Sequence, residues 1–212
     1  MDLEERWLQL CAAQGLDGAE ELRHMAHLYT YGGRAYHNEL HVLDCLQLLD
    51  EYRELAEDAT AVEFALFYHD LSYNPRSSDN EQRSAELAAD FLHPHAPALA
   101  QSVAQLILAT RHASPPSTTD EALICDIDLS ILGSDRQTFD QYRMNIRMEY
   151  NWISHEEFGK GRRKVVAGFL ARDPLYHTPA LRKRFQPSAR KNLTRELKLL
   201  DKHNGKGYLP WS

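Results

Sequence analysis

The amino-acid sequence predicts an all-α fold, a helical bundle of about nine or ten helices. Apolar residues recur at helical spacing in segment after segment of the 212-residue chain, and no run of alternating β-branched residues indicates a strand. Hydrophobic residues make up 43% of the chain and charged residues 26%, a balance typical of globular proteins. We therefore expect a single domain over residues 1–212, with C-terminal helices at 155–203 packing on a core at 20–153.

The first two helices are predicted from short apolar repeats that end at glycines. The first repeat covers residues 3–13 and is followed by Gly15. The second covers residues 22–29 and ends near Gly32 and Gly33. Glycine commonly terminates a helix because it adopts a left-handed conformation without steric cost.

The third predicted helix begins next to two histidines. Leucines at every third position from 40 to 49 predict the helix, and His41 lies among them. His37 lies four residues before His41, so both project from one face if the helix already includes His37. Taken alone, His41 is better explained as a hydrogen-bonded core histidine.

The fourth helix, which Thr60 can cap, ends in two potential metal ligands. Its apolar residues 64–68 lead directly into His69 and Asp70. Buried polar groups need partners, and a metal ion satisfies an imidazole and a carboxylate together. The His-Asp pair alone is weak evidence, because about one such pair is expected by chance in a chain of this composition.

The next three predicted helices lead to a second pair of carboxylates. Residues 85–92 and 99–110 form the first two, and residues 121–132 form the third. Asp126 and Asp128 lie in this third, strongly apolar segment. Side chains two residues apart on a helix are turned by about 200°, so at most one of them faces a given site.

Three further helices are predicted at 135–153, 158–170 and 180–200. The last two are rich in lysine and arginine. These side chains form either a solvated face that covers the core or a patch that faces phosphate groups. Residues 205–212 are expected to form an extended arm.

Composition narrows the classes of function. The formal net charge of −7 argues against sequence-independent binding to nucleic acid, and no sequence-specific binding is expected either. Cys11, Cys45 and Cys125 lie far apart, which indicates reduced, buried thiols, with a single reactive thiol as the alternative. The N-terminus has no signal-peptide core and no apolar run approaches the ~18 residues of a membrane span. We expect a cytoplasmic protein without a membrane partner.

Taken together, the candidate residues resemble the signature of the HD superfamily of metal-dependent phosphohydrolases, which is His … His-Asp … Asp on a bundle of helices. Residues 36–41, Tyr-His-Asn-Glu-Leu-His, are also similar to a segment of cyclic-nucleotide phosphodiesterases, a distant branch of that superfamily. Over most of the chain, residues 34–193, the resemblance is to small bacterial proteins described as predicted HD phosphohydrolases. That group is expected to have an acidic residue near position 186, where this chain has Gln186.

The resemblance implies a metal site. It assigns His41, His69, Asp70 and Asp128 as ligands, with Asp126 as the alternate to Asp128. Mixed nitrogen and oxygen donors suit Mn²⁺, Mg²⁺, Fe²⁺, Co²⁺ or Zn²⁺ without selecting one. One or two divalent ions are implied, and Asp70 would bridge them if two are present.

Other polar side chains receive roles by the same resemblance. His37 would be the general acid that protonates the leaving group, and Glu81 would orient the attacking water. His112 is equally well explained as a surface histidine. The candidates for binding an anionic substrate are Arg34, Arg111, His112 and Arg190.

The activity implied is hydrolysis of a small phosphorylated substrate, a nucleotide monophosphate or a similar phosphomonoester, by metal-activated water. Three alternatives stay open. They are a phosphodiesterase of small nucleotides, a non-catalytic protein that binds nucleotide or metal, and a di-iron oxygenase, which would need further ligands for its second iron. A homodimer is also compatible with the sequence.

Overall fold

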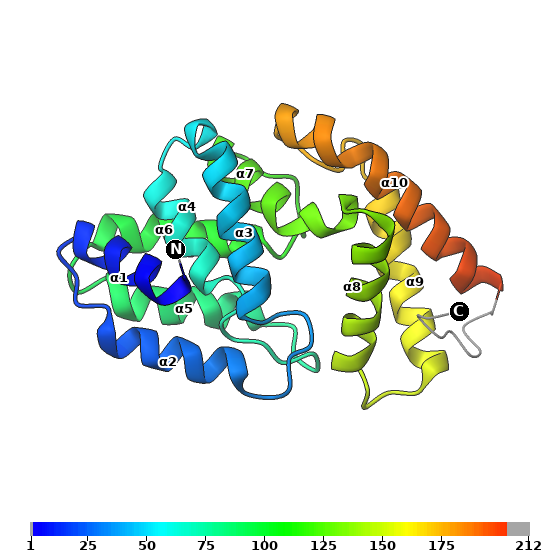
Figure 1. Cartoon of the computed structure of the whole chain (residues 1–212), viewed down its shortest axis with the longest axis horizontal. Helices are drawn as coiled ribbons and strands as arrows, with labels where there is room; N and C mark the ends of the chain where they lie inside the picture. The colour runs from blue at the N-terminus through cyan, green and yellow to red at the C-terminus, as the bar shows by residue number, and fades with distance from the viewer. Residues whose placement is uncertain (1, 203–212) are drawn as a thin grey trace. The chain divides into compact units, whose positions relative to one another are not determined.

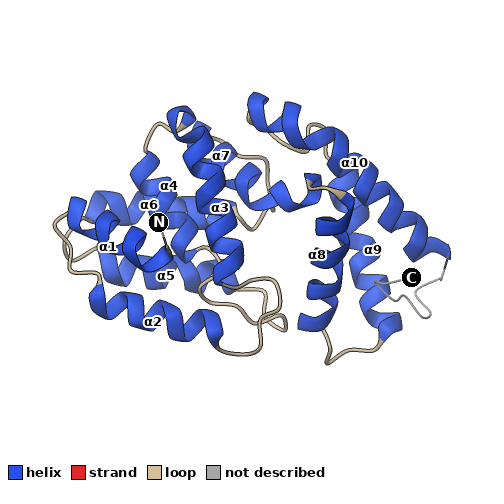
Figure 2. Cartoon of the chain, viewed as in Figure 1, coloured by secondary structure: helices blue, strands red, loops and turns tan. Residues whose placement is uncertain are grey.

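The structure, a computed structural model, describes residues 2–202 and confirms the all-α prediction (Figure 1). Within these residues it contains ten α-helices, two short 3₁₀ helices and no strand (Figure 2). The predicted arm at 205–212 lies outside the described residues. The helices are α1 (Leu3–Ala13), α2 (Ala19–Thr30), α3 (Glu39–Tyr52), η1 (Arg53–Leu55), α4 (Ala59–Tyr68), α5 (Asn80–Leu92), α6 (Pro97–Ala109), α7 (Thr119–Asp128), η2 (Leu129–Gly133), α8 (Arg136–Glu149), α9 (His155–Ala171) and α10 (Pro179–Lys202).

The chain divides into two compact units, an N-terminal unit (Met1–Cys125) and a C-terminal unit (Asp126–Ser212). The division falls inside α7, where no glycine, proline or polar linker separates the halves. The expectation of a single domain over residues 1–212 stays a prediction. No helix among residues 2–202 combines the length and the apolar character that crossing a membrane requires.

The start of α3 differs from the expected one. The side chain of Asn38 accepts a hydrogen bond from the backbone N–H of Leu40 (3.0 Å), which caps the helix and fixes its first residue as Glu39. His37 therefore precedes the helix, and the condition under which it would share a helical face with His41 is not met.

The ends of α4 also differ. Asp58 caps the helix in place of Thr60, because its carboxylate accepts a hydrogen bond from the backbone N–H of Ala61 (2.9 Å). The helix ends at Tyr68, so His69 is its C-cap residue and Asp70 lies just beyond the helix. The apolar run thus delivers the two polar side chains to a helix terminus.

The core of the N-terminal unit is built around α4, which is buried along almost its whole length. A helix that is apolar on every side must be surrounded, and α3, α5 and α6 pack against it. Trp7 of α1 packs edge-on against Phe64, with ring centroids 5.5 Å apart. The buried carboxylate of Glu63 is satisfied by Arg6 and Arg53, each at 2.6 Å.

The C-terminal unit consists of η2, α8, α9 and α10. Glu196 of α10 is completely buried and pairs with Arg162 of α9 (3.0 and 3.1 Å) and with Arg143 of α8 (3.5 Å). Gly133 at the end of η2 lies so close to Phe185 of α10 that a Cβ atom would approach the Phe185 carbonyl oxygen to 2.7 Å. These contacts hold α10 against the rest of its unit.

Candidate metal centre

His41 and His69 meet in the interior of the N-terminal unit. His41 projects from the first turn of α3, and His69 caps the C-terminus of α4. Their Nε2 atoms are 3.2 Å apart, and the two side chains are only 5% and 1% exposed. The approach of two buried imidazole nitrogens to this distance needs a shared proton or a shared cation.

The tautomer of His69 follows from its backbone contact. Its Nδ1 atom lies 2.9 Å from the carbonyl oxygen of Leu66, one turn earlier in α4, and donates its proton there. The Nε2 atom therefore carries the lone pair of the neutral ring. This hydrogen bond has the form seen for metal-binding histidines, in which the outer nitrogen is held by a carbonyl or carboxylate oxygen.

Asp70 adds a carboxylate oxygen to the two nitrogens. Its Oδ2 atom lies 3.2 Å from Nε2 of His69 and 3.6 Å from Nε2 of His41. The same oxygen is buried without a hydrogen-bond partner. Burial alone raises the pKa of Asp70, but the positive charge that the nearby histidines carry when protonated, His69 first and then His37 and His41, outweighs it and holds the pKa below its usual range.

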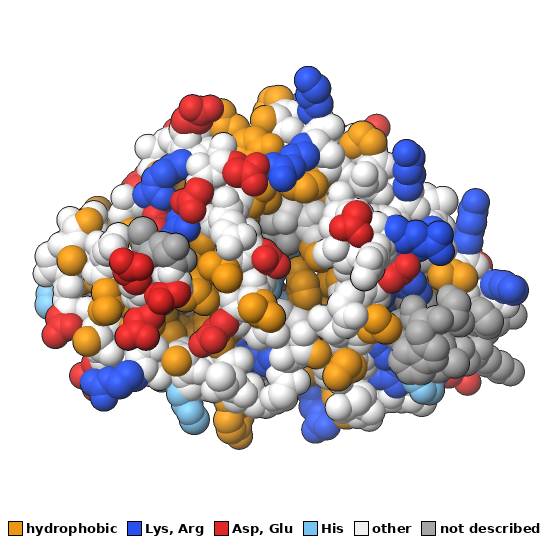
Figure 3. All heavy atoms as spheres, viewed as in Figure 1, with side chains coloured by type: hydrophobic (Ala, Val, Ile, Leu, Met, Phe, Trp, Pro, Cys, Tyr) orange, Lys and Arg blue, Asp and Glu red, His pale blue; other side chains and the backbone are white. Residues whose placement is uncertain are grey.

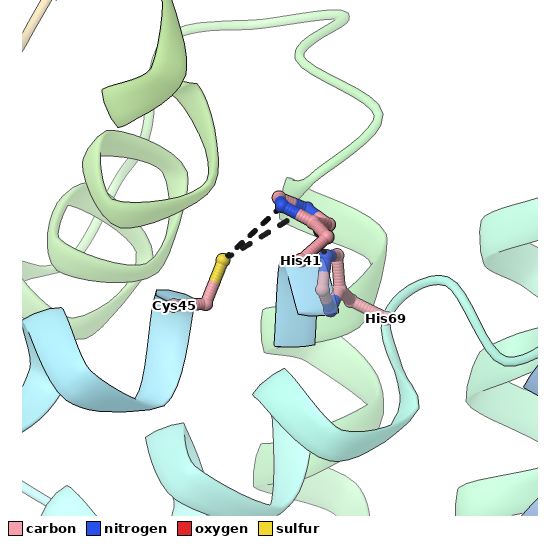
Figure 4. Close-up of side chains that lie close together, drawn as sticks. All are labelled: His41, Cys45 and His69. Atoms are coloured by element: carbon pink, nitrogen blue, oxygen red, sulfur yellow. Dashed lines mark hydrogen bonds between the residues drawn. The ribbon is translucent and has the colours of Figure 1, made fainter. Parts of the chain in front are cut away.

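Cys45 lies on the other side of His41, one helical turn further along α3. His41, Cys45 and His69 form a buried cluster that can hold a metal ion, with ligand atoms within 4.8 Å of one another (Figure 4). The sequence prediction did not include Cys45. The sequence feature that indicates Cys45 is its four-residue spacing from His41, which puts both side chains on one face of a helix.

The position of the Cys45 sulfur distinguishes it from Asp70. Its Sγ atom is 3.8 Å from both ring nitrogens of His41. An atom equidistant from the two nitrogens lies beside the ring and off the axis of the Nε2 lone pair. The present side-chain geometry therefore favours His41, His69 and Asp70 as the convergent donor set, and thiolate ligation requires the ring to turn.

His37 is held in the segment that precedes α3. Its ring stacks on Tyr73 (4.2 Å between centroids, 25° between planes) and meets Tyr36 edge-on at 4.9 Å. The centroid of His37 lies 6.3 Å from that of His41. His37 thus stands near the three convergent donors although it lies outside the helix.

Arg34, expected to bind substrate, donates to three backbone carbonyl oxygens. Nη1 donates to Asp70 (2.6 Å) and His37 (3.3 Å), and Nη2 donates to Leu71 (2.7 Å). The guanidinium also lies over the ring of Tyr73, at 5.7 Å from its centroid. These contacts tie the segment that carries His37 to the backbone that carries Asp70.

Glu81 lies in the first turn of α5 and is partly buried. Its neighbour Asn80 exchanges two hydrogen bonds with the backbone of Asn74 (2.9 and 3.0 Å), and Ser84 accepts one from the backbone of Ser72 (3.0 Å). The first turn of α5 is thereby anchored to the segment that follows Asp70.

His112 and Arg111 follow the C-terminal end of α6. Arg111 is exposed and His112 is partly buried. His112 has a φ of +52°, and its backbone N–H bonds to the carbonyl oxygen of Ala109 (3.0 Å). This left-handed conformation closes the helix in the way that glycine usually does, and it is strained for a residue with a Cβ atom.

Asp126, Asp128 and Arg190 belong to the C-terminal unit. Asp126 is buried, and its two carboxylate oxygens accept hydrogen bonds from the backbone N–H groups of His177 (2.9 Å) and Thr178 (2.5 Å). Burial raises the pKa of Asp126, and these hydrogen bonds offset only part of that rise. Asp128 ends α7 and is partly exposed. Asp126 thus anchors the residues that lead into α10, and the choice between Asp126 and Asp128 as a ligand stays a prediction.

The guanidinium of Arg190 is also engaged with its own unit. It donates to the backbone carbonyl oxygens of Leu170 and Arg172 and lies 3.4 Å from a carboxylate oxygen of Asp173. These bonds connect α10 to the end of α9, which is a structural use of the side chain.

No protein-family model, curated protein or solved structure matches this chain. The indications of its function are therefore the chemistry of the three convergent donors and the sequence motif that contains them.

Proposed function

We propose that this protein is a metal-dependent phosphohydrolase of the HD type, with His41, His69 and Asp70 as ligands of a divalent cation. The observation that carries the proposal is the convergence of two imidazole nitrogens and one buried carboxylate oxygen within 3.6 Å of one another. An Oδ2 atom without a hydrogen-bond partner gives the group a strong preference for a cation.

The donor types support Mn²⁺, Mg²⁺, Fe²⁺, Co²⁺ or Zn²⁺, and one or two ions. When bound, such an ion supplies Lewis acidity toward a phosphoryl oxygen and lowers the pKa of water. The hydrogen bond from Nδ1 of His69 to Leu66 keeps Nε2 available as a donor. The three bonds of Arg34 keep the His37 segment close to Asp70.

His37 is the proposed general acid. A protonated imidazole near the donors can give a proton to the departing oxygen of a phosphate ester. Its stack on Tyr73 restricts the ring to one orientation. Glu81 is proposed to orient the attacking water, and Arg111 with His112 is proposed to bind the phosphate group of a small substrate, a nucleotide monophosphate or a related phosphomonoester.

The test is a comparison of leaving groups in the metal-loaded protein. For His37→Ala we expect hydrolysis of an alkyl phosphate or a nucleoside monophosphate to slow by ~10²–10⁴-fold, because their leaving oxygens need a proton. Hydrolysis of p-nitrophenyl phosphate, whose leaving group departs as an anion, should change much less. Tyr73→Leu, which removes the stacking partner, is the matched control for orientation and should give an intermediate loss.

Equal slowing of both esters by His37→Ala would remove the general-acid role. Absence of turnover with phosphomonoesters, together with turnover of bis(p-nitrophenyl) phosphate, would identify the diesterase alternative. Absence of turnover with every ester by a protein that holds its metal would leave a non-catalytic metal-binding protein.

A further inference from the structure

The charges of the chain are segregated between its two units. Residues 1–125 contain 7 Lys and Arg against 21 Asp and Glu, a net charge of −14. Residues 126–212 contain 17 Lys and Arg against 10 Asp and Glu, a net charge of +7. Charge interactions in solution extend over only about 8 Å at physiological salt, so the sign of the local surface matters more than the total of −7. The C-terminal unit is therefore basic although the whole chain is acidic.

The exposed cations of α10 lie in one line along the helix. Lys191 and Lys198 are spaced by seven residues, and Lys202 follows four residues later, all beyond Pro187. At 3.6 residues per turn these three positions fall within about 20° of a common line, and at 1.5 Å per residue they extend over about 17 Å. We call Lys191, Lys198 and Lys202 the basic stripe. Several Lys and Arg side chains stand along this part of the surface (Figure 3).

Neighbouring residues leave Lys191 and Lys198 without a compensating charge. The adjacent positions Pro187, Ser188 and Thr194 are uncharged, and the acidic neighbour Asp201 is already paired with Arg163 of α9 (2.6 Å). Within residues 2–202, neither Lys191 nor Lys198 takes part in an ion pair. The opposite face of α10 is committed to the core through Ala189, Leu193 and Leu200 among others. The helix is thus fixed from behind and exposes a straight row of cations.

From this row we infer a second function: the C-terminal unit binds the sugar-phosphate backbone of a nucleic acid, independently of base sequence. A straight row of lysines matches a regular row of phosphates, which repeat every 3.4 Å along one strand of a duplex. Lysine is depleted in protein–protein interfaces, whose centres are rich in aromatic residues, and the stripe contains no aromatic side chain. Membrane-surface helices insert several exposed apolar side chains, whereas Leu199, which lines the surface beside the stripe, is partly buried.

The surface at the stripe is also open to a large ligand. Residues of α10 from Arg190 to Lys202, including Lys191 and Lys198, line a surface hollow of about 620 Å³. Arg195 lies beside the stripe and is oriented by two hydrogen bonds to Asp140 (2.8 and 2.9 Å). A phosphate in this hollow meets several cations and the Thr194 hydroxyl.

The test measures binding of the full chain to a fluorescent duplex of mixed sequence and about 20 base pairs, prepared once as DNA and once as RNA. Binding is followed by fluorescence anisotropy over a series of KCl concentrations. We expect binding whose log K falls linearly with log [KCl] for at least one duplex. Lys191→Gln/Lys198→Gln/Lys202→Gln should weaken binding at least tenfold at ~50 mM KCl and reduce the salt slope by about 2–3, because each lost phosphate contact contributes about 0.9.

The matched control is Lys160→Gln/Lys164→Gln/Lys183→Gln, which removes the same charge from exposed positions of the same unit off the stripe. Circular dichroism checks that both triple variants remain helical. Near-wild-type binding by the control triple supports the stripe. The assignment would be overturned if neither duplex binds at low salt, or if both triple variants lose affinity equally. It would also be overturned if polyglutamate at equal charge displaces the duplex completely, which would identify an acidic protein as the partner of the stripe. None of these readouts depends on phosphohydrolase activity.

Discussion

At the scale of single residues, Asp70 makes the strongest case for a cation. Its Oδ2 atom is buried, lacks a hydrogen-bond partner and faces two imidazole nitrogens. The sequence predicted this group because adjacent polar residues at the end of an apolar helix need a common partner. It could not predict Cys45, because a cysteine among leucines has the pattern of a core residue until its distance from His41 is known. Nor could it show that Arg34 binds carbonyl oxygens, since an arginine before a histidine motif is equally suited to a phosphate.

The strained backbone of His112 gives a prediction that separates conformation from side-chain function. Both His112→Gly and His112→Ala remove the imidazole, but only glycine adopts a φ near +52° without steric cost. We expect the free energy of unfolding of the glycine variant to exceed that of the alanine variant by about 1 kcal/mol in urea denaturation.

The rates of ester hydrolysis by His112→Gly and His112→Ala test the role of the imidazole side chain. If His112 binds the phosphate group, both variants lose turnover to the same extent in spite of their different stabilities. Glycine and alanine variants of equal stability would show that the conformation of His112 is not strained in solution.

At the scale of elements, helix type and order followed from apolar periodicity, whereas the ends of helices depended on individual caps. Asn38 and Asp58 fix the starts of α3 and α4, and each is one of several nearby polar residues that could have done so. The sequence also could not predict that Asp126 accepts hydrogen bonds from backbone N–H groups. These groups belong to His177 and Thr178, which lie about 50 residues further along the chain. A buried aspartate on an apolar helix indicates a partner without saying whether that partner is a metal or a peptide group.

The anchoring of α10 by Asp126 can be measured separately from metal binding. Asp126→Ala removes two hydrogen bonds to a buried carboxylate, so we expect a loss of about 2–3 kcal/mol in the free energy of unfolding. Its bound metal should be unchanged at temperatures where the variant is folded. The resemblance predicts that Asp128→Ala, in contrast, weakens metal binding. A loss of metal from Asp126→Ala in the folded state would exchange the roles of the two aspartates.

At the scale of the whole molecule, the two-unit organisation was not visible in the sequence. The boundary lies within the apolar helix α7, where a linker rich in proline, glycine or serine would normally mark it. Once the boundary is known, the separation of charge into −14 and +7 can be counted directly from the sequence. The expectation that a net charge of −7 excludes nucleic acid treated the chain as one surface, and the proposed phosphate-binding stripe depends on treating the units separately.

The most direct test of the central claim is the metal content of the purified full chain by elemental mass spectrometry, after supply of Mn²⁺ or Zn²⁺. We predict about one or two equivalents of metal in the wild type. Cys45→Ala should hold the same amount, because the Cys45 sulfur lies beside the His41 ring and off the Nε2 lone pair. Asp70→Asn should hold none, because it keeps the shape of the side chain but loses its charge. Metal retained by Asp70→Asn and lost by Cys45→Ala would contradict the proposed ligand set. A wild type that binds no metal would contradict the metal site altogether, and with it the proposed hydrolase.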